Sequence, residues 1–216
     1  MTLPNHRNSV VNSLKIVLNR LSPSGVIIMN VQFLTIFRLL LLGLCIFSSI
    51  DSFSEERQSM GLTLTSANFP PMGDIPEEFT CDGNNSSPAL SWSNVPANAK
   101  SLVLIVDDPD APDPNHPKMT WVHWILYNIP PTITELAQAI PASNLPGWTQ
   151  QGINDWKRTG YGGPCPPIGK HRYFHKLYAL DVELSNLHQP NKAQLEAAMA
   201  QHIIEKTELI GLYQKK

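Results

Sequence analysis

Residues 101–107 read SLVLIVD and residues 121–129 read WVHWILYNI, two nearly continuous apolar runs that are rich in β-branched side chains. Such runs are typical of strands that are covered on both faces. The first run stops at Pro109 and the second at Pro130, and proline is frequent throughout the chain, with 19 residues. Because proline ends strands and interrupts helices, we expect many loops and few long helices. The sequence therefore predicts a mainly β fold.

Two further strands are predicted around these runs. Residues 61–66 alternate with a period of two, and residues 170–181 continue the β pattern towards the C-terminus. Helices are expected in two places. Thr132 with Glu135 has the spacing of a capping box and predicts a short helix that ends at Pro141. Asn191 with Gln194 predicts a C-terminal helix that ends at Gly211, with one apolar face formed by Leu195, Ala198, Met199 and Ile203.

Length and composition indicate one folded domain. About 155 residues of the 216 remain after the N-terminal stretch is set aside, which is the size of one domain with one core. Hydrophobic residues make up 42% and charged residues 16%, a balance that excludes a disordered chain. The formal net charge of −2 and the absence of a Lys/Arg cluster argue against nucleic-acid binding. No cofactor is expected.

The N-terminal segment resembles a secretory signal. Arg38 precedes the apolar run 39–47, and Ser52 and Ser54 are small residues before a cut at Glu55. We expect residues 1–54 to be an extension and signal peptide, with Met29 as an alternative start, and residues 60–216 to form the domain. The mature protein would be periplasmic or secreted, without a stable membrane span. The alternative is an uncleaved anchor over residues 26–50, with Arg38 reaching the membrane surface.

Two short segments carry candidate site residues. At the end of the first strand, Asp107, Asp108 and Asp110 lie in a turn stiffened by prolines, which suits a binding site, although a solvated acidic turn has the same composition. His123 lies within an apolar strand, where an imidazole needs a partner. A core histidine and a ligand contact both agree with that pattern.

Residues 160–169, GYGGPCPPIG, hold four glycines and three prolines. Glycines let backbone amides approach a bound group, so this loop predicts an anion cradle, with a plain tight connection as the alternative. His171 and Tyr173 follow, and a period of two places them on one strand face together with His175. An imidazole and a phenol in this place can both donate hydrogen bonds to phosphate or carboxylate oxygens.

Together, the segments DDPDAP, the HW of WVHWILYNIP, and GYGGPCPPIGKHRY followed by LYALD resemble the phosphatidylethanolamine-binding protein family, in particular its bacterial Raf kinase inhibitor-like branch. The resemblance covers roughly residues 62–213. It implies an antiparallel β-sandwich with a small pocket near one end, flanked by the C-terminal helix. The pocket residues carried over from the family are Asp108, Asp110, Pro112, Trp121, His123, Gly162, Gly163, Pro164, His171 and Tyr173.

The same resemblance implies a function without catalysis. The expected partner is a small anion or a phospholipid headgroup, of the phosphate or phosphoethanolamine type. A kinase or protease inhibited through surface loops is the alternative, and a homodimer stays open. Cys81 and Cys165 would lie near one end of the sandwich, where a disulfide and two free thiols are both compatible with the family pattern.

Asp108 and Asp110 should repel an anion, so we expect imidazolium groups and glycine amides to compensate. A metal-dependent hydrolase is a further alternative, with Asp108, Asp110, His123 and His171 as ligands, although no metal-ligand spacing such as H-E-x-x-H occurs.

Overall fold

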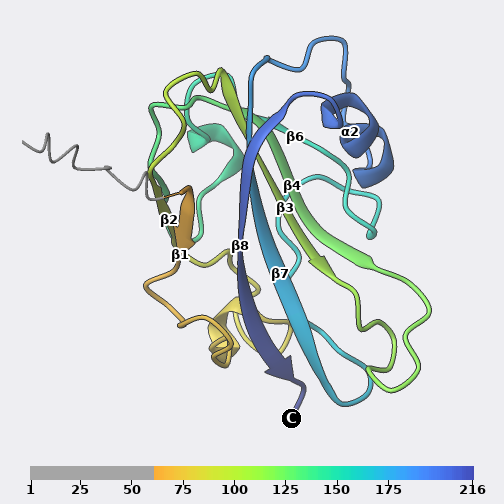
Figure 1. Cartoon of the computed structure of the whole chain (residues 1–216). Coiled ribbons are helices and arrows are strands. Elements are labelled where there is room, and N and C mark those ends of the chain that lie inside the picture. Colours follow the sequence, from red (N-terminus) through yellow and green to blue (C-terminus); the bar gives the residue numbers. More distant parts are fainter. Residues whose placement is uncertain (1–60) are drawn as a thin grey trace, which may run out of the picture. The chain divides into compact units, whose positions relative to one another are not determined.

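The computed structural model describes residues 61–216 (Figure 1). The predicted signal peptide, the alternative anchor and the alternative start at Met29 lie outside the described residues. Within residues 61–216, no helix is long and apolar enough to cross a membrane.

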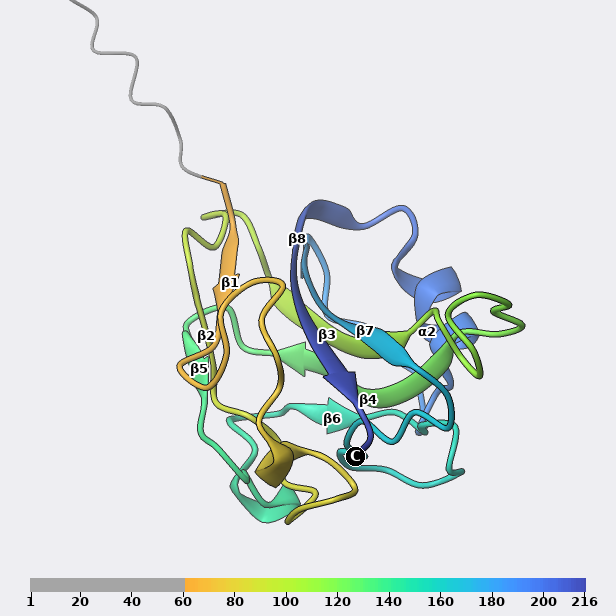
Figure 2. The same cartoon turned by 90° about the horizontal axis from the view of Figure 1, so that it is seen from below.

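The strands form two sheets in which every pair is antiparallel. The smaller sheet has the order β1 (Thr63–Thr65), β2 (Leu90–Ser93), β5 (Glu135–Leu136). The larger sheet has the order β6 (Gln150–Gln151), β4 (Trp121–Ile129), β3 (Ser101–Asp108), β7 (Lys170–Leu180), β8 (Ile203–Gln214). Two 3-10 turns, η1 (Glu77–Phe79) and η2 (Ala142–Asn144), and the helix α2 (Lys192–Met199) complete the described elements. Figure 2 shows the two sheets edge-on, with α2 on the outer side of the larger sheet.

The strand β3 lies at the centre of the larger sheet, and all eight of its residues are buried. Leu102, Leu104 and Val106 face the core between the two sheets. Val103 and Ile105 face the second core, where α2 contributes Leu195 and Met199. Burial on both faces explains the continuous apolar run, because an alternating pattern would place polar side chains in one of the two cores. The predicted antiparallel β-sandwich with a helix is confirmed.

The predicted helix at Thr132–Glu135 is wrong. Glu135 and Leu136 form β5 and pair with Ser91 and Leu90 of β2. The amide of Trp92 also donates to the carbonyl of Thr134 at 2.8 Å. A capping box supplies only two local hydrogen bonds, whereas the edge of β2 offers ladder partners and burial for Leu136, so tertiary pairing prevails over the local signal.

The C-terminal helix begins where it was predicted but ends much earlier. Asn191 and Gln194 form a capping box, with reciprocal hydrogen bonds of 2.9 and 3.0 Å. The helix ends at Met199, and residues 203–214 form β8, which pairs with β7 from Lys170 to Leu180. Gly211 is therefore a strand residue, and its proposed role as a helix stop is wrong. The physical reason is that the edge of β7 offers hydrogen-bond partners to residues 203–214. The periodicity of a local segment contains no information about such a distant partner.

Gly211 has a packing role that can be tested. A Cβ at this position would lie 2.6 Å from Cγ1 of Ile75 and 2.8 Å from a ring carbon of Phe69, so a side chain would force these core residues apart. We expect Gly211→Ala to lower the free energy of unfolding by about 1–3 kcal/mol, as measured by urea denaturation. Lys206→Ala, at an exposed position of the same strand, is the control and should change it by less than about 1 kcal/mol. Equal stability of the two variants would contradict this packing.

Candidate functional site

A cavity of about 340 Å³ opens at one end of the sandwich, where β3 ends and β4 and β7 begin. Its base is formed by buried polar side chains, and its rim is formed mainly by apolar ones. The lining residues are Asp108, Ala111, Pro112, Met119, Trp121, His123, Trp156, Cys165, Pro166, Pro167, His171 and Tyr173. Of the residues predicted for the pocket, Asp108, Pro112, Trp121, His123, His171 and Tyr173 line this cavity, whereas Asp110, Gly162, Gly163 and Pro164 do not.

His123 reaches the cavity through an irregularity in β4. Val122 pairs with Asp107 and Trp124 pairs with Val106, so the register leaves His123 as the extra residue between them. Val122 packs into the core beside α2 and Trp124 into the core between the sheets, and His123 turns towards the cavity. Bulges of this kind commonly redirect a side chain next to a functional site.

The ring of His123 is neutral at physiological pH. Its Nδ1 lies 2.7 Å from the carbonyl oxygen of Gly162, an acceptor, so Nδ1 carries the proton and donates it. Burial lowers the pKa of His123 to about 4, because the charged ring would lose its hydration. The second nitrogen, Nε2, is therefore a hydrogen-bond acceptor.

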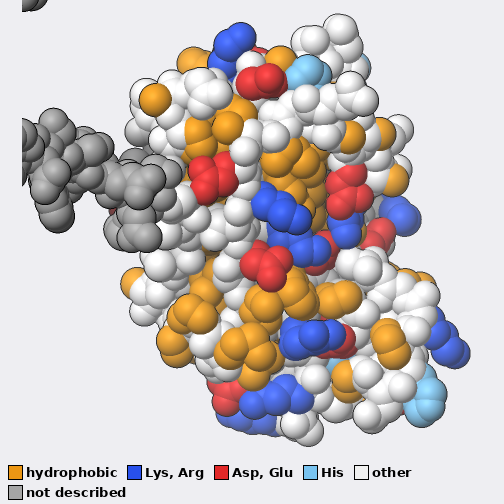
Figure 3. All heavy atoms as spheres, in the orientation of Figure 1, with side chains coloured by type: hydrophobic (Ala, Val, Ile, Leu, Met, Phe, Trp, Pro, Cys, Tyr) orange, Lys and Arg blue, Asp and Glu red, His pale blue; other side chains and the backbone are white. Residues whose placement is uncertain are grey.

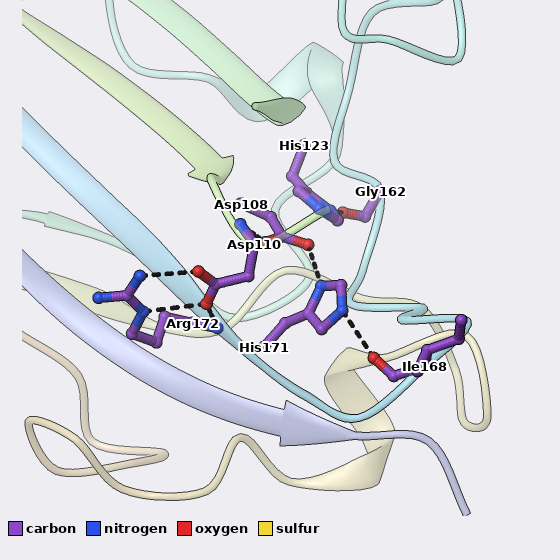
Figure 4. A network of polar contacts seen from close by, with 7 residues as sticks. All are labelled: Asp108, Asp110, His123, Gly162, Ile168, His171 and Arg172. Carbon is purple, nitrogen blue, oxygen red and sulfur yellow. Dashed lines mark hydrogen bonds and ion pairs between the residues drawn. The ribbon is translucent and has the colours of Figure 1, made fainter. Parts of the chain in front are cut away.

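Asp108 and His171 form a buried pair beside His123 (Figure 4). Nδ1 of His171 lies 2.7 Å from Oδ2 of Asp108, and Oδ1 of Asp108 accepts the amide of Asp110 at 2.8 Å. Nε2 of His171 lies 2.9 Å from the carbonyl oxygen of Ile168 and donates to it. Burial raises the pKa of Asp108, although the hydrogen bond to His171 opposes this shift. One proton is thus shared along the line from Nδ1 to Oδ2, and the pair has no net charge wherever that proton lies.

The pairing changes the expected role of His171. The side chain lies on the cavity wall, but both ring nitrogens already have oxygen partners in the protein. The expectation that this imidazole is a free donor to a bound group is therefore wrong for the described structure.

Asp110 lies outside the cavity. Arg172 donates to it from its backbone amide at 2.9 Å, from Nε at 2.9 Å and from Nη2 at 2.7 Å. The hydrogen bonds from the Arg172 side chain hold the pKa of Asp110 below its usual value. We expected Asp108 and Asp110 to repel an anion. Arg172 neutralises Asp110 and His171 neutralises Asp108, so this repulsion is avoided without an excess of positive charge in the cavity.

Asp107 points to the opposite face of the sheet. It is fully buried and forms ion pairs with Lys176 of β7 at 2.8 Å and with Lys192 of α2 at 2.6 Å. Figure 3 shows the Lys and Arg side chains gathered beside Asp and Glu side chains across this face, over β7 and β8. Asp107 therefore helps to attach α2 to the sheet and has no contact with the cavity.

Tyr173 lines the cavity and carries a buried hydroxyl. Its ring is almost fully buried and packs edge-on against His123, with ring centroids 5.2 Å apart. Its hydroxyl has no hydrogen-bond partner among the described residues. Burial also raises the pKa of Tyr173, so the hydroxyl keeps its proton and is available to donate.

The glycine loop supports the cavity from behind. The amide of Gly162 donates to the carbonyl of His123 at 3.0 Å, and the amide of Gly163 donates to Oδ1 of Asn85 at 2.6 Å. The carbonyl of Pro164 accepts the amide of Cys81 at 3.0 Å. The amides of Gly162 and Gly163 are therefore not free for the predicted cradle, because both N–H groups already have protein acceptors. A Cβ on Gly162 would clash with the ring of Trp156, which explains the need for glycine there.

The rim also contains Ala111, Met119, Trp156, Cys165, Pro166 and Pro167, which were not among the residues predicted for the pocket, although Ala111 and residues 165–167 belong to segments that the sequence singled out. Trp156 packs edge-on against Trp121 and His123, with centroid distances of 5.4 and 5.1 Å. Its amide donates to Oδ1 of Asn154 at 3.1 Å. Trp156 lies in a loop without a strand or helix pattern, and nothing in its local sequence indicates a position at the cavity.

A metal centre has no support in the described part of the chain. Within residues 61–216, no three His, Cys, Asp or Glu side chains converge on a position that could hold a metal ion. Asp110 accepts hydrogen bonds from Arg172, and the two ring nitrogens of His171 are hydrogen-bonded to Asp108 and to the carbonyl of Ile168. The residues considered as metal ligands of a hydrolase therefore do not meet at one point.

The structure joins Cys81 to Cys165 by a disulfide, with the Cα atoms 5.4 Å apart. The bond links the loop that carries Pro166 and Pro167 to the segment after η1. We expect thiol counting on the denatured, unreduced protein to give no free thiol from this pair. Cys81→Ser with Cys165→Ser should lower the free energy of unfolding by about 2–4 kcal/mol. The two cysteines are 84 residues apart, so the bond closes a long loop and lowers the conformational entropy of the unfolded chain. Two titratable thiols in the oxidised wild-type protein would contradict the bond.

The buried histidines predict a loss of stability in acid. His175 has no hydrogen-bond partner for either ring nitrogen among the described residues, and burial lowers its pKa to about 4, as it does for His123. In the unfolded chain both rings titrate near 6.5, so between pH 6.5 and 4 the unfolded state binds more protons than the folded state. Stability should therefore fall as the pH falls through this range, by at most about 1.4 kcal/mol per pH unit for each ring.

Urea denaturation at several pH values between 7.5 and 4.5 measures this slope. His175→Leu should make the slope shallower, whereas His188→Gln, at an exposed position, should leave it unchanged. An identical slope in wild type and His175→Leu would show that His175 does not contribute to the acid sensitivity.

Comparisons with known proteins agree with the fold. The family model described as phosphatidylethanolamine-binding protein matches residues 65–214. A protein of Methanothermobacter thermautotrophicus named UPF0098 protein is 49% identical over 148 residues, covering 68% of this chain and 95% of its own length. A UPF0098 protein of Chlamydia trachomatis is 45% identical over 154 residues, covering 71% of this chain and 99% of its own length.

Two crystal structures have the same fold. One is a phosphatidylethanolamine-binding protein homologue from Chlamydia trachomatis, with a TM-score of 0.66, 44% identity, and coverage of 72% of this chain and 99% of that one. The other is YbcL of E. coli, described as a member of the mammalian family, with a TM-score of 0.65, 32% identity, and coverage of 72% and 99%. The family model spans most of the described domain, and these relatives match it over nearly their whole length. The chain therefore belongs to the phosphatidylethanolamine-binding protein family.

Proposed function

We propose that the cavity binds a small anion or a phospholipid headgroup, of the phosphate or phosphoethanolamine type, and that it does so without catalysis. The observation that carries this proposal is the hydroxyl of Tyr173, a buried donor without a protein partner at the base of the cavity. A buried polar group in this state costs free energy unless it finds a partner. A bound oxyanion would supply that partner.

The charges around the cavity allow an anion to enter. Asp108 shares a proton with His171, and Asp110 is held by Arg172 outside the cavity, so neither carboxylate leaves an uncompensated charge at the base. The Nε2 atom of His123 is an acceptor beside the donor of Tyr173. A phosphate monoanion has both oxygen acceptors and a P–O–H donor, so it matches both groups at once.

The arrangement of reactive groups supports binding rather than turnover. Cys165 is part of a disulfide and is not a free nucleophile. Both nitrogens of His171 are engaged, and Nδ1 of His123 is engaged with Gly162. The hydroxyl of Tyr173 lies beside His123, but burial raises the pKa of the phenol, so this hydroxyl keeps its proton and is a weak nucleophile.

We also propose that the mature protein works outside the cytoplasm, after removal of residues 1–54. The disulfide between Cys81 and Cys165 supports this, because such bonds persist mainly in oxidising compartments. Mass spectrometry of the native protein would test it, since an N-terminus near Glu55 is expected and an intact N-terminus would contradict export.

Binding can be tested by calorimetry with phosphoethanolamine. We expect Tyr173→Phe to weaken binding by about 10- to 100-fold, because a hydrogen bond to a charged group contributes about 1.5–3 kcal/mol. Tyr178→Phe is the matched control: it removes a hydroxyl from the same strand, on the face that lies away from the cavity. Phosphorus NMR should recover the ligand unchanged.

Two outcomes would contradict the proposal. Equal affinity of wild type and Tyr173→Phe would mean that the hydroxyl is not the donor. Release of inorganic phosphate during the titration would show that the cavity is catalytic.

A further inference from the structure

A second cleft lies beside β6, the strand that forms one edge of the larger sheet next to β4 (Figure 2). Its volume is about 460 Å³, and it shares no lining residue with the cavity described above. The lining residues are Tyr127, Ala142, Leu145, Thr149, Gln150, Gln151, Thr159, His188 and Gln189. A ligand in this cleft would therefore contact none of the residues that line the cavity.

The lining of the cleft is polar but contains no Asp, Glu, Lys or Arg. Three of its residues are glutamines and two are threonines, and their amides and hydroxyls can both donate and accept hydrogen bonds. An anion or a cation would find no carboxylate, ammonium or guanidinium group as a counter-charge. The hydroxyl groups of a ligand also donate and accept, so the lining fits an uncharged, hydroxyl-rich molecule.

The hydroxyl of Tyr127 connects three parts of the cleft wall. The ring of Tyr127 on β4 is almost fully buried, and its hydroxyl donates to Oε1 of Gln150 on β6 at 2.7 Å. The same hydroxyl lies 3.0 Å from the carbonyl oxygen of Leu187, in the loop that precedes α2. The amide of Ile153 holds this loop a second time, because it donates to the carbonyl of Pro190 at 2.9 Å. The walls are therefore fixed relative to one another before a ligand binds.

The backbone of Gln189 is strained. Its φ of 46° lies in the left-handed region, which residues other than glycine, asparagine and aspartate rarely adopt. Residues in sparsely populated conformations are found mainly where the surrounding structure imposes them, and they are frequent at binding sites. This strain and the place of Gln189 in the wall both agree with a role in binding.

An exposed tryptophan adjoins the cleft. Trp148 is 53% exposed and directly precedes Thr149, whose amide and hydroxyl donate to the carbonyl of Pro146 at 3.1 and 2.6 Å and close a turn. Gly147 in this turn has a φ of 57°, and a Cβ there would lie 2.7 Å from Cγ of Pro130, so the turn packs closely against that proline. The turn thus presents the indole to solvent from a fixed backbone, as a flat apolar surface.

We propose that this cleft is a second binding site, whose ligand is a neutral oligosaccharide. The hydroxyl groups of the sugar exchange hydrogen bonds with the amides of Gln150, Gln151 and Gln189. One sugar ring stacks with its C–H face on Trp148. The cleft is separate from the cavity, so this inference does not rest on the function proposed above. A neutral oligosaccharide occurs both free and as part of an insoluble polymer, and the experiment distinguishes the two sources.

The test is calorimetry with two neutral trisaccharides, cellotriose and triacetylchitotriose. At least one of them should bind the wild type with a Kd on the order of 1 mM, because neutral hydrogen bonds each contribute little. Trp148→Ala should weaken this binding by about 5- to 10-fold through the loss of stacking, and Trp148→Phe should weaken it less.

Gln189→Ala gives a second reading that does not depend on Trp148. It should weaken binding by about 2- to 10-fold, the effect of one neutral hydrogen bond. Gln201→Ala is the matched control, because it removes an exposed glutamine that does not line the cleft, and it should leave the affinity unchanged. Proton–nitrogen NMR should show shifts of the indole signal of Trp148 and of the glutamine side-chain amides in the cleft when the sugar is added.

Three outcomes would overturn the inference. The first is a wild type that binds neither trisaccharide at concentrations up to about 10 mM, ten times the expected Kd. The second is an affinity that is unchanged in both Trp148→Ala and Gln189→Ala. The third is displacement of the sugar by phosphoethanolamine, which would place the sugar in the cavity.

Insoluble polymers identify the source of the sugar. Cosedimentation of the wild type with cellulose or chitin, lost in Trp148→Ala, would support the inference with a polymer as the ligand. Binding of a trisaccharide without cosedimentation would support it with a soluble oligosaccharide as the ligand.

Discussion

The pairing of β3 with β7 and the position of the cavity depend on one constraint. The carboxylates at the end of the buried strand β3 must be neutralised. Asp107 and Asp108 are buried at the end of the strand, and Asp110 is buried in the turn that follows. An isolated charge in such a place would be very costly. Each carboxylate therefore has a cationic or proton-sharing partner on β7: Lys176 for Asp107, His171 for Asp108 and Arg172 for Asp110. The antiparallel register of β3 and β7 makes these three pairings possible at once.

The alternation of side chains along the two strands gives the three pairs different roles. Asp107 and Lys176 lie on the outer face, where Lys192 joins them and α2 docks. Asp108 and His171 lie on the inner face and form the polar base of the cavity. Asp110 and Arg172 close the turn at the edge of the site. The attachment of α2 and the cavity thus lie on opposite faces of one sheet.

The cavity itself depends on an interruption of regular structure. The bulge in β4 turns His123 inward beside Tyr173, and Gly162 lets the ring of Trp156 approach closely enough to form a wall. The disulfide and the hydrogen bonds of Gly163 and Pro164 hold the surrounding loop in place. A rigid polar base under an apolar rim is the kind of preorganised site that binds a ligand without paying a large ordering cost.

The sequence by itself determined the strands with strong patterns and the side chains that share a face. The apolar runs of β3 and β4 predicted strands covered on both faces, and a period of two placed His171 and Tyr173 on one face of β7. Tertiary structure decided everything that depends on distant partners. The edge of β7 turned residues 203–214 into a strand, the edge of β2 turned Glu135 and Leu136 into another, and Arg172 drew Asp110 out of the cavity. The amides of Gly162 and Gly163 went to protein acceptors, and Trp156 reached the rim from a loop without a pattern. The physical reason is that periodicity and capping report local geometry, whereas hydrogen-bond partners and wall residues are selected by contacts between segments far apart in the chain.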